Sequence, residues 1–196
     1  MTSGKDRKVE LGDLAKMKKA GQAITMVTAY DAPTARLVDR AGVDTILVGD
    51  SLSNVILGYA STVPVTLDDM IHHIRAVRRG TDRVFVIGDM PFGSYNASID
   101  AAVENATRIL KEGHADAVKL EGGGPMVDRV RAMVAGGIPV CGHLGLTPQT
   151  ASMLGGYRVQ GRSAAAARRM VEDSLALQEA GAFMLVLEMV PKRLAH

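Results

Sequence analysis

The sequence predicts an α/β fold in which parallel strands alternate with helices, built as an incomplete (β/α)₈ TIM barrel. Apolar runs rich in β-branched residues recur at residues 24–30, 45–50, 84–90, 116–121, 138–143 and 183–190. Segments with helical periodicity separate most of these runs, at residues 32–41, 67–79, 98–112, 125–135 and 163–180. This repeated order is typical of parallel strands joined by right-handed crossovers.

Two architectures satisfy this order, an open doubly wound sheet and a (β/α)₈ barrel. Polar residues and glycines gather at the carboxyl end of every run, as in Gly49-Asp50-Ser51, Gly88-Asp89 and Gly142-His143. A barrel uses all of these ends for its active site, whereas an open sheet concentrates its polar residues at one switch point. The sequence therefore favours the barrel.

Each element has a local signal. Residues 84–87 (VFVI) are apolar on both alternating faces, which is typical of a strand covered on both sides. Helices end at a glycine in RAGVDT, KEGHADA and EAGAFM, and we expect Gly42, Gly113 and Gly181 to adopt the left-handed conformation there. The stretch EGGGP at 121–125 lacks the lysine of a P-loop and is interpreted as a tight strand-to-helix turn.

Composition restricts the class of protein. The 196 residues are 47% hydrophobic and 22% charged, which is ordinary for a globular chain with one sizeable core. The apolar stretches are too short to span a membrane and the start MTSGKDRK lacks a signal-peptide core, so we expect a cytoplasmic protein with no membrane partner. The net charge of +2 is too small to indicate nucleic-acid binding, and Cys141 is expected to be a buried packing residue.

We expect a single domain, with residues 1–22 forming an N-terminal tail and helix and residues 23–196 forming the incomplete barrel. The chain ends just after the sixth strand, whereas a (β/α)₈ barrel takes about 250 residues. Strands one and six would then be open edges, which we expect to be covered by another subunit or by residues outside this sequence. A truncated product is the other interpretation.

Two aspartates follow neighbouring strands and form the first candidate site. If the second and third strands pair, Asp50 and Asp89 end roughly 5 Å apart, the spacing of adjacent strands. Carboxylates that close repel each other unless a cation or a proton lies between them, and hard oxygen ligands favour Mg²⁺. From the residues alone, a shared metal site and separate capping or turn roles are equally good interpretations.

Longer motifs resemble a known family. The stretches ITMVTAYD, LVGDSLSNVILGYASTVPVT, KLEGG, PVCGHLGLTPQ, GGYRVQGR and LVLEMVP resemble, in order and spacing, ketopantoate hydroxymethyltransferase. The resemblance runs from about Val9 onward and implies a barrel of the phosphoenolpyruvate and isocitrate lyase kind, a Mg²⁺ ion and a homo-oligomer. It implies transfer of a hydroxymethyl group from 5,10-methylenetetrahydrofolate to the 2-oxo acid 3-methyl-2-oxobutanoate, which gives 2-dehydropantoate for pantothenate and coenzyme A synthesis.

The resemblance also implies a role for each polar residue at the strand ends. Asp50 and Asp89 would bind the metal and the substrate, and Glu121 would reach the metal through water. Substrate contacts would come from Ser51, Lys119 and His143, with Ser51 and Lys119 at the substrate carboxylate. Glu188, at the end of strand six, would be the general base.

Less specific interpretations stand beside these roles. Lys119 and Glu121 could form an ion pair on one face of their strand, and His143 could be a hydrogen-bonded core histidine. His72, His73 and His114 lie outside the motifs and are given no catalytic role. Two other functions stay open, namely a related carbon–carbon lyase or phosphonate enzyme acting on a 2-oxo acid, and a non-catalytic truncated fragment.

Overall fold

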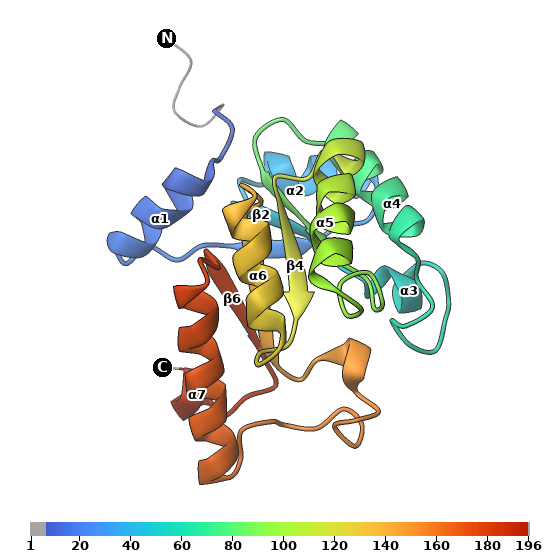
Figure 1. Ribbon diagram of the computed structural model, residues 1–196. Helices are drawn as coiled ribbons and strands as arrows, with labels where there is room; N and C mark the ends of the chain where they lie inside the picture. The colour runs from blue at the N-terminus through green and yellow to red at the C-terminus, as the bar shows by residue number, and fades with distance from the viewer. Residues whose placement is uncertain (1–6, 196) are drawn as a thin grey trace.

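Six parallel strands form one sheet in the computed structural model, which describes residues 7–195 (Figure 1). The strands pair in sequence order, so every neighbour is joined through a crossover that contains a helix. They are β1 (Met26–Thr28), β2 (Thr45–Val48), β3 (Phe85–Asp89), β4 (Ala117–Glu121), β5 (Val140–Gly145) and β6 (Met184–Glu188). Each overlaps its predicted range, and the sequential order is that of a barrel wall rather than of a doubly wound sheet.

The helices also follow the sequence pattern. The structure contains α1 (Leu11–Lys19), α2 (Ala32–Arg40), α3 (Leu52–Val55), α4 (Leu67–Arg79), α5 (Ile99–Gly113), α6 (Met126–Ala135), α7 (Ala164–Glu179) and α8 (Lys192–Ala195), with a 3₁₀ turn, η1, at Pro148–Thr150. The sequence did not indicate α3, η1 or α8, which are single turns too short to show a period. The predicted turn at EGGGP is confirmed, since it joins the end of β4 to the start of α6.

Polar caps explain where the long helices begin. The Asp31 carboxylate accepts a hydrogen bond from Thr34 N (2.7 Å) at the start of α2. Thr66 and Asp69 form a reciprocal capping box at the start of α4. Such caps satisfy backbone N–H groups that have no partner inside the helix.

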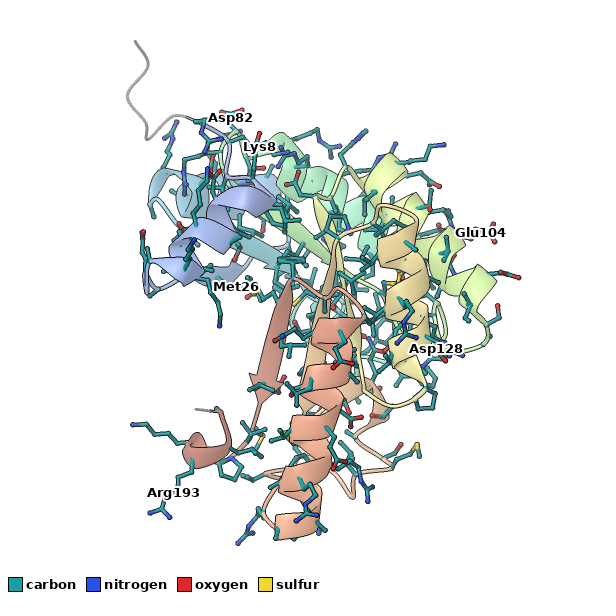
Figure 2. All side chains as sticks on the ribbon, turned by 60° about the vertical axis from the view of Figure 1, so that its left-hand side comes forward. Lys8, Met26, Asp82, Glu104, Asp128 and Arg193 are labelled. Carbon is teal, nitrogen blue, oxygen red and sulfur yellow. The ribbon has the colours of Figure 1, made fainter. Side chains whose placement is uncertain are left out.

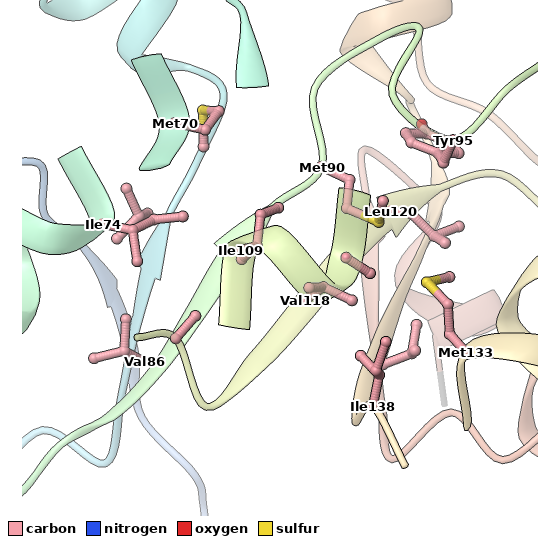
Figure 3. Packing of buried hydrophobic residues seen from close by; sticks show 14 of the residues in the cluster. Met70, Ile74, Val86, Met90, Tyr95, Ile109, Val118, Leu120, Met133 and Ile138 are labelled. Atoms are coloured by element: carbon pink, nitrogen blue, oxygen red, sulfur yellow. The ribbon is translucent and has the colours of Figure 1, made fainter. Parts of the chain in front are cut away.

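The outer face of the sheet carries the larger core. Helices α4, α5, α6 and α7 follow one another across this face in the order of the strands (Figure 1). Their apolar sides pack on the outward residues of the strands, as Ile74 and Ile109 do around Val86 and Val118 (Figure 3). Exposed charges such as Glu104 and Asp128 point away from the sheet (Figure 2).

The inner face is divided along the strand direction. Toward the amino ends it is apolar, with Phe85, Ile87 and Cys141 packed against Leu14 of α1. Cys141 is fully buried there, as predicted. Toward the carboxyl ends the same alternation presents charged side chains, as at Asp89 after Ile87. Inward-facing residues recur at every second position of a strand. The inner face is therefore apolar near the amino ends of the strands and polar at their carboxyl ends.

One predicted helix stop is wrong. Gly42 and Gly181 adopt positive φ as expected, but Gly113 is still helical and the left-handed residue is His114 (φ 62°). A Cβ on Gly113 would lie 3.0 Å from Ile74 Cγ2, so glycine serves the close approach of α5 to α4.

Strands β1 and β6 are the two edges of the sheet within residues 7–195. Every residue of β6 is only partly buried, and Val27 of β1 is 42% exposed. The segment before α1 is tied to the sheet by a hydrogen bond from Val9 N to Arg83 O (2.7 Å). Among the described helices, none combines the length and the apolar character needed to cross a membrane.

Candidate active site

All seven predicted site residues line one pocket at the carboxyl ends of the strands. The pocket has a volume of about 320 Å³, and its lining includes Asp50, Ser51, Asp89, Lys119, Glu121, His143 and Glu188. A slightly larger cavity of about 400 Å³ lies beside the start of α7 and contains Arg169 and Asp173 but none of these seven residues. The predicted site residues are therefore concentrated in the smaller pocket.

Asp50 and Asp89 meet because β2 and β3 are neighbours with Val48 opposite Gly88. Asp50 N donates to Asp89 Oδ2 (3.0 Å), and the two residues are 4% and 2% exposed. A Cβ on Gly49 would lie 2.9 Å from Ser51 Oγ, so the glycine of this Gly-Asp pair keeps the approach open. The two aspartates therefore lie close together, as predicted.

Lys119 pairs with Asp89 and not with Glu121. Asp89 is opposite Lys119 in the register, and Lys119 Nζ lies 2.7 Å from Asp89 Oδ1. That oxygen has no well-aligned hydrogen bond from the described residues, so the contact is mainly ionic. Burial would lower the pKa of Lys119, but the charges of Asp89, Glu121 and Asp50 outweigh it and raise this pKa. The ammonium therefore stays charged.

The pocket holds more negative than positive charge. Burial, with the nearby charge of Asp89, raises the pKa of Asp50 to about 7, and burial also raises the pKa of Asp89 against the opposing effect of Lys119. One ammonium faces the three carboxyl groups of Asp50, Asp89 and Glu121. Excess buried negative charge of this kind is relieved by protons or by a cation.

These side chains fit an open Mg²⁺ site, in which the protein supplies only part of the coordination. Among residues 7–195, no three His, Cys, Asp or Glu side chains converge into a preformed metal cage. Mg²⁺ is usually held by only one or two carboxylates, with water and substrate filling the other positions. Asp50 and Asp89 supply that number, and the ionic contact of Asp89 Oδ1 leaves that oxygen without an aligned donor.

His143 lies between Glu121 and Glu188. It is 3% exposed, and its Nδ1 lies 3.2 Å from Lys119 Nζ and 3.4 Å from Glu121 Oε1. Because an ammonium only donates, Nδ1 of a neutral His143 accepts from Lys119 and the hydrogen lies on Nε2. Nε2 is 3.3 Å from Glu188 Oε2. Burial would lower the pKa of His143, but contacts with Glu121 and Glu188 raise it.

Glu188 is more open than its apolar sequence neighbours indicate. Its side chain is 40% exposed, because β6 is an edge strand of the described sheet. The carboxylate still faces the pocket, beside His143. A carboxylate placed in this way can exchange protons with a substrate bound in the pocket.

Two residues outside the predicted set, Tyr30 after β1 and His73 of α4, support the pocket. The Tyr30 hydroxyl hydrogen-bonds Ser51 Oγ (2.8 Å), and His73 of α4 donates from Nδ1 to Tyr30 O (2.7 Å). The carbonyl is an acceptor only, so this contact fixes the hydrogen on Nδ1 of His73. His73 was assigned no function in the sequence analysis, and in the structure it binds the backbone of the segment that follows β1.

Comparison with known proteins decides the family. A model of the family described as ketopantoate hydroxymethyltransferase matches residues 8–196. The chain belongs to this family. A protein of Moorella thermoacetica named 3-methyl-2-oxobutanoate hydroxymethyltransferase is 60% identical over 189 residues, which are 96% of this chain and 70% of that protein. A Heliobacterium modesticaldum protein of the same name is 57% identical over 190 residues, which are 97% of this chain and 69% of the relative.

Solved structures of other proteins share the fold of this chain. A 2,3-dimethylmalate lyase, titled a member of the PEP mutase/isocitrate lyase superfamily, matches 91% of this chain with a TM-score of 0.64 and 19% identity. A phosphonopyruvate hydrolase matches with a TM-score of 0.67 and 14% identity. The chain spans 62% and 63% of these two proteins. The predicted barrel of the phosphoenolpyruvate and isocitrate lyase kind is therefore confirmed as a partial barrel of six strands.

The sequence analysis missed Gln149 and Tyr95, which are both buried and hydrogen-bond residues that line the pocket. Gln149 lies in the motif PVCGHLGLTPQ, and a buried polar residue in such a motif could have been singled out as a candidate. Tyr95 follows β3 in a loop and carries no local signal. Their partners are far away in the sequence, so only the folded chain connects them to the site.

Proposed function

We propose that the pocket converts 3-methyl-2-oxobutanoate to 2-dehydropantoate, with 5,10-methylenetetrahydrofolate as the one-carbon donor. One observation carries the proposal: in a chain of this family, Asp50, Asp89, Lys119 and Glu188 converge on one pocket from four different strands. A 2-oxo acid needs a cationic partner for its carboxylate and a base near C3, and this pocket offers both.

The two aspartates are the groups that would hold Mg²⁺, with Glu121 contributing through water. Bound there, Mg²⁺ would supply Lewis-acid stabilisation of the negative charge that develops on the keto oxygen. Lys119 and Ser51 bind the substrate carboxylate. Lys119 can do so while it remains paired with Asp89, since an ammonium has three hydrogens to donate.

Glu188 is the general base of the proposed reaction. It takes the single proton from C3 of the substrate, and the electrons of that C–H bond form the enolate. C3 then forms a carbon–carbon bond to the methylene carbon of the folate, and both C–N bonds that held this carbon break. Water supplies the oxygen of the new hydroxymethyl group, and tetrahydrofolate leaves with one proton from C3 and one from that water on its two nitrogens. His143, whose neutral form directs Nε2–H toward Glu188 and the pocket, hydrogen-bonds the substrate or product oxygen.

Carbon–carbon lysis or phosphonate chemistry on a 2-oxo acid is the second candidate. It is favoured only by the shared fold of the lyase and hydrolase neighbours, at 14–19% identity. A homo-oligomer and a cytoplasmic location belong to the proposal as well. Turnover of the 2-oxo acid that requires the folate would support the first function, and turnover without it would support the second.

The base is tested by isotope exchange. Glu188→Gln preserves shape and removes the base, so exchange of the C3 proton with deuterated water, followed by NMR, is expected to fall by about 10²–10⁴-fold. Glu104→Gln, on the exposed face of α5, is the matched control and keeps full exchange. Undiminished exchange in Glu188→Gln would place the base elsewhere.

The metal site is tested by titration calorimetry with Mg²⁺. Asp50→Asn and Asp89→Asn each remove one ligand charge, and each is expected to weaken Mg²⁺ binding at least tenfold. The exposed Asp128→Asn substitution is the control, which keeps the affinity of the parent. Unchanged binding in either pocket variant would mean that the two carboxylates do not share an ion.

A further inference from the structure

Gln149 makes four polar contacts beneath the pocket and is 3% exposed. Its side-chain Nε2 donates to Asp50 Oδ2 (2.9 Å) and to Met90 O (2.9 Å). Its Oε1 accepts from the Tyr95 hydroxyl (2.5 Å). Its backbone N donates to Glu121 Oε2 (3.1 Å). One residue therefore contacts two of the four acids that line the pocket, Asp50 and Glu121.

The orientation of the Gln149 amide follows from its partners. The carbonyl oxygen of Met90 can only accept, so the amide atom beside it must be the nitrogen. The second hydrogen of that nitrogen is then directed at Asp50, and the amide oxygen faces Tyr95. Every donor and acceptor of the side chain is used, which makes this contact to Asp50 specific in direction.

Tyr95 fixes the other side of the same network. It is 1% exposed, and its hydroxyl donates to Gln149 at 2.5 Å while it accepts from Glu121 N at 3.2 Å. Tyr95 lies in the loop after β3 and Gln149 in η1 after β5. The pair thus links these two loops to the ends of β2 and β4, which carry Asp50 and Glu121.

We propose that Gln149 is a positioning residue for the Asp50 and Glu121 carboxylates, and that Tyr95 acts through it. This inference rests on the proposed function, because the orientation matters when Asp50 receives Mg²⁺. Two carboxylates in an acid-rich pocket repel each other and turn apart unless neutral donors hold them. Gln149 supplies donors without adding a positive charge that would compete with a cation.

The test is direct Mg²⁺ binding by calorimetry on folded protein, which does not depend on turnover. Gln149→Met has similar length and keeps the backbone N–H contact to Glu121, so it removes only the amide contacts. Loss of an outer partner of this kind weakens metal binding by about 10–100-fold, which is the expected increase in Kd. Tyr95→Phe is expected to weaken binding in the same direction by a smaller factor.

A matched control separates positioning from simple support of the fold. Ser94→Ala removes another buried hydrogen bond in the loop of Tyr95, the one from Ser94 Oγ to Pro91 O (2.7 Å). It is expected to lower stability without changing the Kd for Mg²⁺. The double variant Tyr95→Phe/Gln149→Met is expected to bind no more weakly than Gln149→Met alone, because both changes act through one amide.

Each outcome decides the inference. Unchanged Kd in Gln149→Met overturns it, and if that variant does not fold, unchanged Kd in Tyr95→Phe overturns it instead. If the increases in Kd caused by the two substitutions multiply in the double variant, Tyr95 does not act through Gln149. If the parent protein binds no Mg²⁺, the proposed function fails together with the inference, whereas binding by the parent and equally by the variants refutes only the inference.

Discussion

Replacing Lys119 with methionine is expected to destabilise the protein more than any exposed lysine substitution. The ammonium is almost fully buried, lies 2.7 Å from Asp89 Oδ1, and is the cation that offsets the charges of Asp50, Asp89 and Glu121. Methionine keeps the length and the apolar stem but removes the charge. The carboxyl groups are then left buried without a positive partner.

The expected magnitude follows from that geometry. Opposite charges 2.7 Å apart attract by about 6 kcal/mol at an effective dielectric constant of roughly 20. Part of this lost attraction energy is recovered when Asp89 takes up a proton. Breaking a buried ion pair typically costs about 3–5 kcal/mol. We therefore expect the free energy of unfolding to fall by about 3–5 kcal/mol at pH 8 in Mg²⁺-free buffer.

The pH dependence has a definite sign. Burial already raises the pKa of Asp89, and without Lys119 it rises further above the unfolded value. A carboxyl group whose pKa is higher in the folded state lowers the free energy of unfolding at high pH, where it is ionised. This destabilisation disappears as the pH falls and the group is protonated. The difference between variant and parent should therefore shrink from pH 8 to pH 6, by at most about 1.4 kcal/mol per pH unit for each carboxyl group.

Urea unfolding at the two pH values measures these differences. Lys111→Met on the exposed side of α5 is the control and is expected to change stability by no more than about 0.5 kcal/mol. A loss below about 1 kcal/mol for Lys119→Met at pH 8, or a loss that is equally large at pH 6, would refute the reasoning.

Three further predictions concern packing. Burial raises the pKa of Cys141 to about 12, so a disulfide-exchange reagent at pH 8 should modify it only after unfolding, and rapid labelling without denaturant would contradict its position on the inner face. A Cβ on Gly80 would lie 2.3 Å from Ala32 O, so Gly80→Ala should lower stability by about 1–3 kcal/mol. Gly12→Ala in α1 meets nothing within 4 Å and should raise stability by about 0.5–1 kcal/mol. Equal shifts in the thermal unfolding of these two glycine variants would be inconsistent with the packing described.

The alternation of strands and helices could be predicted because each element depends on residues within a few positions of one another. Apolar runs and positive-φ glycines such as Gly42 are signals of this local kind. Gly113 shows the limit. Its sequence context resembles a helix stop, but α5 continues through Gly113, the left-handed residue is His114, and a Cβ on Gly113 would lie 3.0 Å from Ile74 Cγ2 of another helix.

The sequence by itself determined the succession of strands and helices along the chain, the polar residues at the strand ends and, through motif resemblance, the family. Only the tertiary structure decided which of those residues touch. Lys119 pairs with Asp89 because the register of β3 and β4 places them opposite each other, and not with Glu121, its neighbour along the strand. Gln149 reaches Asp50 from 99 positions away because two loops meet over the ends of the strands. Such contacts depend on register and loop paths, which local periodicity does not encode.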